Sequence, residues 1–109
     1  MSNQVQNPND KKKYDLEERT AKFGEAIIEF ALALSDTSVN RPLKSQIVRS
    51  GTSIGANYME ADAAESKKDF QHKIALCEKE SKETTHWLRM IAKANPQKKE
   101  ICQKLWREA

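Results

Sequence analysis

Two short polar constellations carry the residue types that metal binding or catalysis would need. Glu83-Thr84-Thr85-His86 has the E-x-x-H spacing, which brings a carboxylate and an imidazole to one helix face in di-iron bundles. That chemistry needs the motif on two helices and a glutamate from each of two others, and here it occurs once. His72 and His86 would lie roughly 21 Å apart along a helix, so they cannot share one metal. We therefore expect no metal and no other cofactor.

The second constellation is a polar ladder on one flank of an expected helix, formed by Arg49, Ser53, Asn57 and Glu60. Arg49 and Glu60 are three turns apart, so within one helix they would need Ser53 or water as a relay, whereas two subunits could pair them directly. We interpret the ladder as a hydrogen-bonded helix contact, with a ligand or nucleic-acid contact as the alternative. No general base, nucleophile and orienting group converge, so we predict no enzyme and no catalytic residue.

Four amphipathic helices are expected to position these residues. Charged residues make up 32% of the chain and apolar residues 38%, with only 3 Gly and 3 Pro, which is typical of helices. Apolar residues at three- and four-residue spacings predict helices over about 15–35, 41–64, 67–94 and 96–108, after a flexible polar tail at 1–13. Short turns make neighbours antiparallel, so we expect one all-α domain over 14–109, an up-down-up-down four-helix bundle.

Capping patterns and glycines refine this prediction. Asp15–Glu18 and Ser66–Asp69 have the spacing of capping boxes, and Asn95–Pro96 should end the third helix. Gly51 and Gly55 lie inside the second helix, where each costs about 1 kcal/mol relative to Ala, so a neighbouring helix should approach closely. The expected inward residues are Leu16, Phe23, Ile27, Phe30 and Leu34; Leu43, Ile47, Ile54, Tyr58 and Ala61; Phe70, Ile74, Cys77, Ser81, Thr84, Leu88 and Ile91; and Ile101 and Leu105. Cys77 and Cys102 should lie roughly 16 Å apart, too far for a disulfide.

Apolar residues outside these seams indicate self-association. Ile28 and Leu32 lie on a second face of the first helix, and Leu76, Trp87 and Met90 lie on a second face of the third. Exposed apolar stripes on a small protein usually mark an interface, although long Lys and Glu side chains could cover them. We predict that these five residues contribute to a subunit interface.

The net charge of +3 is modest, but basic residues are clustered. A solvated surface or contacts with phosphate would each explain the clusters, and oligomerisation would repeat every one of them. No segment approaches the roughly 18 apolar residues of a membrane span, and the N-terminus has no apolar signal core, so we expect a cytoplasmic protein. The candidate nucleic-acid contacts are Lys11, Lys12, Lys13, Lys67, Lys68, Lys73, Lys98, Lys99, Lys104 and Arg107.

The stretch from Arg49 to Ala61 resembles the R-x-x-x-S-I-x-x-N-x-x-E-[AG] pattern of a bacterial four-helix-bundle family, the 23S rRNA intervening-sequence or S23-like proteins. Asp69-Phe70, His72-Lys73, Lys79-Glu80, Glu83-Thr84 and Trp87-Leu88 fit the same pattern. The resemblance covers about residues 15–95. It implies a four-helix bundle that assembles as a homopentameric ring, without a known activity. A related bundle, the accessory protein of diversity-generating retroelements, binds nucleic acid through a basic surface.

Together these observations favour a non-catalytic homo-oligomeric bundle that binds RNA or a ribonucleoprotein partner. The resemblance implies that the oligomer is a pentamer. The alternative is an oligomeric protein–protein adaptor without affinity for nucleic acid.

Overall fold

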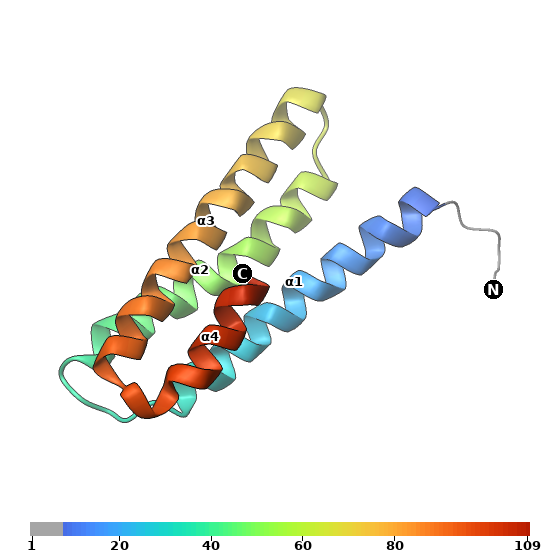
Figure 1. Cartoon of the computed structure of the whole chain (residues 1–109). Coiled ribbons are helices and arrows are strands. Elements are labelled where there is room, and N and C mark those ends of the chain that lie inside the picture. The colour runs from blue at the N-terminus through green and yellow to red at the C-terminus, as the bar shows by residue number, and fades with distance from the viewer. Residues whose placement is uncertain (1–7) are drawn as a thin grey trace.

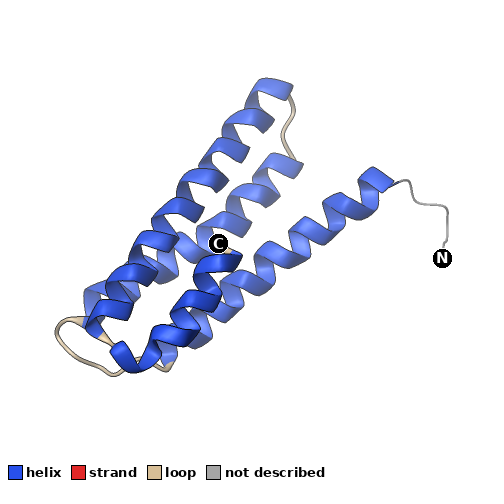
Figure 2. Cartoon of the chain, viewed as in Figure 1, coloured by secondary structure: helices blue, strands red, loops and turns tan. Residues whose placement is uncertain are grey.

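The computed structural model describes the backbone of residues 8–109 and the side chains of residues 15–109. Four helices follow one another, and a short 3-10 turn, η1 (Pro96–Lys98), precedes the last of them. Each helix runs antiparallel to the one before it, as Figure 1 shows, so the predicted up-down-up-down bundle is confirmed. Figure 2 shows helices joined only by short loops across the described residues. The helices are α1 (Pro8–Leu32), α2 (Asn40–Asp62), α3 (Lys67–Ala94) and α4 (Lys99–Glu108).

The start of α1 differs from the expectation. The helix begins at Pro8 rather than near residue 15, so the predicted flexible tail is wrong for residues 8–13, while residues 1–7 lie outside the described part. Proline is favoured in a first helical turn, and Asp10 follows it there, which gives an earlier start signal. Asp15 therefore lies inside α1, and the Asp15–Glu18 pair is not its N-terminal cap.

The other helix ends lie close to the predicted ones. Ser66 caps α3, because its Oγ accepts a hydrogen bond from the backbone N–H of Asp69 at 3.0 Å. The helix ends at Ala94, directly before Asn95 and Pro96, as expected. The predicted ends of α1 and α2 were two to three residues too late, because α1 ends at Leu32 and α2 at Asp62.

The core lies where all four helices overlap. It consists of Phe23, Ile27, Phe30, Leu34, Ile47, Ile54, Leu88, Ile91, Cys102 and Leu105, and all of them except Cys102 are among the residues expected to point inward. Gly51 permits this packing, because a Cβ there would lie 2.9 Å from two side-chain carbons of Ile27. The close helix approach predicted from the glycines is therefore confirmed between α1 and α2.

The fourth helix covers only half of the third. The hydroxyl of Ser81 donates to the backbone oxygen of Ala109 at 2.6 Å, which places residue 109 level with the middle of α3. Beyond that point α3 has no fourth helix beside it, so Phe70 is exposed although its spacing predicted burial. Ile101 is also exposed rather than inward, because α4 packs chiefly on α3 and makes little backbone contact with α1.

Candidate functional site

The polar ladder connects α2 to α3. Arg49 donates one hydrogen bond to Glu80 at 3.2 Å and another to Glu83, both on α3. Glu83 also accepts from the indole N–H of Trp87 at 3.0 Å. The Arg49 guanidinium therefore bridges two carboxylates, one of which orients a tryptophan.

The other end of the ladder makes a second bridge. Glu60 accepts from the Lys73 ammonium at 2.6 Å, and this hydrogen bond raises the Lys73 pKa. Ser53 and Asn57 instead bind the backbone of their own helix, donating to the carbonyls of Arg49 and Ser53 at 2.6 and 2.9 Å. Within the chain, Arg49 and Glu60 thus reach separate partners on α3 and need no relay, and the ladder is a helix–helix clamp.

This clamp also explains the E-x-x-H pair. Glu83 is engaged by Arg49 and Trp87, and the exposed His86 ring packs edge-on against Trp87, with the ring centroids 4.8 Å apart. Across the described residues, no group of three or more His, Cys, Asp or Glu side chains could hold a metal. Glu83 therefore has a structural role.

The two cysteines are free, as expected. Cys102 is buried between α3 and α4, while Cys77 is half-buried and its thiol donates to the Ile54 carbonyl at 3.4 Å. Burial raises the pKa of both thiols, so both stay protonated at neutral pH. Both cysteines therefore act as small apolar side chains.

The predicted interface residues differ in exposure. Leu32 is 79% exposed and Ile28 is also exposed, so the apolar stripe of α1 has no cover within the chain. Leu76, Trp87 and Met90 are only half-buried, and Trp87 packs against the chain's own core. The α3 stripe is therefore partly used inside the subunit, because the Arg49–Glu83 clamp draws Trp87 toward α2.

A groove runs along the α1 stripe, between α1 and α2. It encloses about 410 Å³ over a floor of small residues that includes Gly24 and Gly55. Ile28 lines it from α1 and Met59 from α2, and Met59 is 61% exposed. Sequence reasoning missed Met59, although its position one residue after Tyr58 placed it at the edge of the seam. This groove extends the apolar surface from one helix to two.

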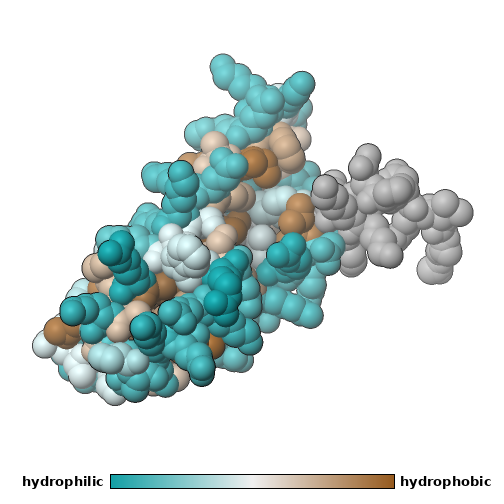
Figure 3. Space-filling model, viewed as in Figure 1, coloured by the Kyte–Doolittle hydropathy of each residue, from teal (hydrophilic) through white to brown (hydrophobic). Residues whose placement is uncertain are grey.

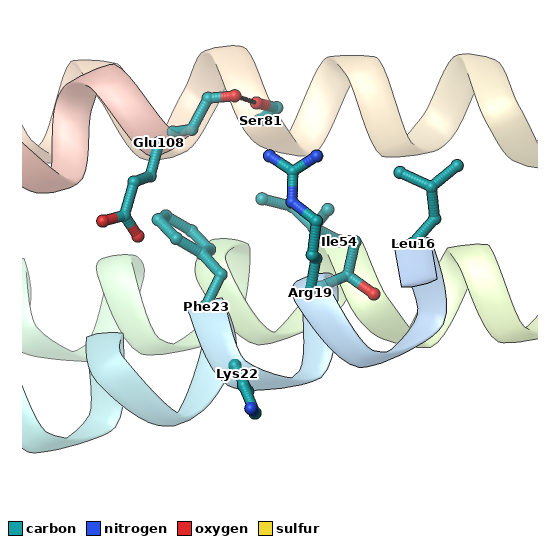
Figure 4. A pocket seen from close by; sticks show the side chains of 9 residues that line it. Leu16, Arg19, Lys22, Phe23, Ile54, Ser81 and Glu108 are labelled. Atoms are coloured by element: carbon teal, nitrogen blue, oxygen red, sulfur yellow. Dashed lines mark hydrogen bonds between the residues drawn. The ribbon is translucent and has the colours of Figure 1, made fainter. Parts of the chain in front are cut away.

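A second cavity, of about 370 Å³, opens where α4 ends. Figure 4 shows Arg19 reaching from α1 toward Ser81 on α3, while Glu108 points back toward Phe23. Leu16 and Ile54 supply apolar walls, and Lys22 also lines the cavity, so two cations and the Glu108 carboxylate border an apolar interior.

The candidate basic residues do not form one patch. Lys67 and Lys68 lie exposed at the first turn of α3, whereas Lys98 and Lys99 lie beyond its last turn, roughly 42 Å away along a 28-residue helix. Lys73 pairs with Glu60 and is no longer a free phosphate contact. Lys104 and Arg107 are exposed on α4, and the side chains of Lys11, Lys12 and Lys13 lie outside the described residues.

An apolar core shared by four short-looped helices, with a charged clamp between α2 and α3, defines a four-helix-bundle protein. The chain matches the 23S rRNA-intervening sequence protein family over residues 12–109. A crystal structure of a protein of unknown function from the S23 ribosomal protein family of Bacteroides thetaiotaomicron is similar to it. That structure has 30% sequence identity and a TM-score of 0.81, over 89% of this chain and 87% of that one. No curated protein matches the chain. The chain belongs to the 23S rRNA-intervening sequence protein family.

Proposed function

We propose that this protein is a non-catalytic homo-oligomer, a pentameric ring acting in the cytoplasm without a cofactor, that binds RNA or a ribonucleoprotein. The observation that carries the assembly is the uncovered apolar surface of α1 and α2, with Ile28, Leu32 and Met59 exposed beside a small-residue groove. Exposed apolar area of this kind is unfavourable in water and is usually buried by a partner. In the described residues, no helix is long and apolar enough to span a bilayer.

The positions of the two apolar stripes favour a ring. The α1 stripe lies on the α1–α2 side of the bundle, and the α3 stripe lies on the adjacent α2–α3 side, where Trp87 binds Glu83. When two different surfaces of a subunit meet, the contact is heterologous, and it closes into a ring if the rotation fits.

Charge supports RNA as the partner. Each copy contributes +3, and a ring repeats every basic cluster around its circumference. Figure 3 shows hydrophilic side chains over most of the visible surface, with separate apolar patches between them. The residues proposed to contact phosphate are Lys67, Lys68, Lys98, Lys99, Lys104 and Arg107.

A gel-shift titration of the full chain with a structured RNA tests the function. We expect a shift at low salt that weakens as salt rises, because phosphate contacts release counterions. The absence of any shift at low salt would contradict RNA binding. A protein partner that stays bound after nuclease treatment, combined with no RNA shift, would favour the adaptor instead.

A further inference from the structure

An exposed tryptophan lies on the flank of α4 that faces α3. Trp106 is 56% exposed, although Cys102 and Leu105 of the same helix are buried. Glu108 points toward Phe23 of α1 (Figure 4), and helical spacing places Trp106 on the opposite side of the buried residues. Lys99, two turns earlier, shares that side.

Cations of α3 lie near this flank of α4. The Ser81–Ala109 hydrogen bond sets the antiparallel register, so Trp106 lies level with a point between Lys82 and Arg89. These two exposed residues are seven apart and therefore share one helix face, and Lys93 lies one turn further on. We call Lys82, Arg89, Lys93, Lys99 and Trp106 the α3–α4 surface.

Neighbouring carboxylates are largely turned away from this surface. Glu80 and Glu83 lie on the α2 side of α3 and bind Arg49. Glu100 and Glu108 of α4 are both exposed, but Glu108 points toward α1 (Figure 4) and therefore away from this surface. Glu78 is exposed one turn before Lys82 and is the α3 acid that borders this surface. Residues 78–109 contain eight Lys or Arg against five Asp or Glu. The α3–α4 surface therefore combines a positive field with an accessible aromatic ring.

We propose that the α3–α4 surface binds an unpaired segment of RNA, with Trp106 stacking on a base and the four cations contacting phosphates. This inference rests on the proposed RNA-binding function and adds the site and the strandedness of its ligand. An unpaired base offers an open face for an indole, whereas the bases of an A-form duplex are already stacked within it. The surface lies away from the α1–α2 groove and from the α2–α3 clamp, so a ring built on those sides leaves it accessible.

The test compares a single-stranded RNA of about a dozen nucleotides with a duplex of the same length, using the full chain. Trp106→Leu should lower affinity for the single strand about five- to hundredfold, which corresponds to about 1–3 kcal/mol per stacked base. Affinity for the duplex should change little. Trp106→Phe should keep most of the affinity, because a phenyl ring also stacks. In a Trp87→Phe background, the single strand should quench Trp106 fluorescence.

A matched pair of charge variants separates this site from general attraction. Lys82→Glu/Arg89→Glu and Lys22→Glu/Lys44→Glu change the net charge equally, but the second pair lies on α1 and α2, and neither residue is proposed to contact RNA. Only the first should abolish the fluorescence quenching and most single-strand binding. Equal losses from both pairs would overturn the inference, as would equally tight binding of an acidic peptide. Unchanged binding by Trp106→Leu would overturn it while leaving RNA binding intact, and a wild-type chain that binds no RNA would remove both.

Discussion

The side chains of Asn40 and Asn95 each donate a hydrogen bond to the other, at the end of the bundle where the α1–α2 loop meets the turn before α4. Asn40 Nδ2 lies 3.0 Å from Asn95 Oδ1, and Asn95 Nδ2 lies 2.9 Å from Asn40 Oδ1. Each amide also donates to a backbone carbonyl, Asn40 to Ser35 and Asn95 to Ile91. Both side chains are buried, so this pair fastens the α1–α2 loop to the turn before α4.

We expect Asn40→Ala and Asn95→Ala each to lower the free energy of unfolding by about 1–3 kcal/mol, because each leaves the other amide buried with an unmet bond. The double variant should lose clearly less than the two single losses added together. Urea denaturation of the four proteins measures this coupling. Additive losses would mean that the two amides act independently.

The glycine contacts give a prediction with an internal control. Gly51→Ala should destabilise the chain by about 1–3 kcal/mol, because the new methyl would overpack against Ile27. Gly24→Ala is the control, since its added Cβ would meet Thr52 at an ordinary 3.6 Å and alanine favours helix. In thermal melts, the melting temperature of Gly51→Ala should therefore fall, whereas that of Gly24→Ala should rise or stay unchanged. A Gly51→Ala variant as stable as wild type would contradict the close α1–α2 approach.

The pKa shifts of four groups predict that the free energy of unfolding falls at alkaline pH. Burial raises the pKa of Cys77, Cys102 and Tyr58, and the Glu60 hydrogen bond raises that of Lys73. A group whose pKa is higher in the folded than in the unfolded state contributes its full stabilisation at pH values below its unfolded-state pKa. This stabilisation is lost as the pH rises through the folded-state pKa. The free energy of unfolding should therefore decline above the 9.0 of an unperturbed thiol.

Denaturant titrations at a series of alkaline pH values measure this decline. Cys77→Ser should make the first part of the decline in the free energy of unfolding shallower, because one thiol no longer titrates. A free energy of unfolding that rises with pH in this window would contradict the assigned directions.

The helices and most of the core followed from the sequence because seven-residue apolar spacing directly reports a buried helix face. Phe70 and Ile101 broke the rule, since burial also depends on which neighbour reaches that level of the bundle. The Asn40–Asn95 pair was not predictable, because its partners are 55 residues apart and both polar. The ladder residues were correctly grouped, yet their partners on α3 required the register of two helices.

The α1 stripe predicts where a charge would break the assembly. Leu32→Glu should lower the solution mass, because a buried unpaired carboxylate in a subunit contact is strongly unfavourable. Val39→Glu is the matched control, since Val39 is also exposed but lies in the loop before α2. Circular dichroism should show both variants folded. Equal masses for both variants and the wild type would exclude Leu32 from the interface.

Light scattering of the wild-type chain on a sizing column tests the central claim of a homo-oligomeric ring most directly. We expect the mass of five 12.5-kDa chains, with Ile28, Leu32 and Met59 buried between copies. The mass of a single 12.5-kDa chain would contradict it and would leave the apolar surface of α1 and α2 without its proposed role.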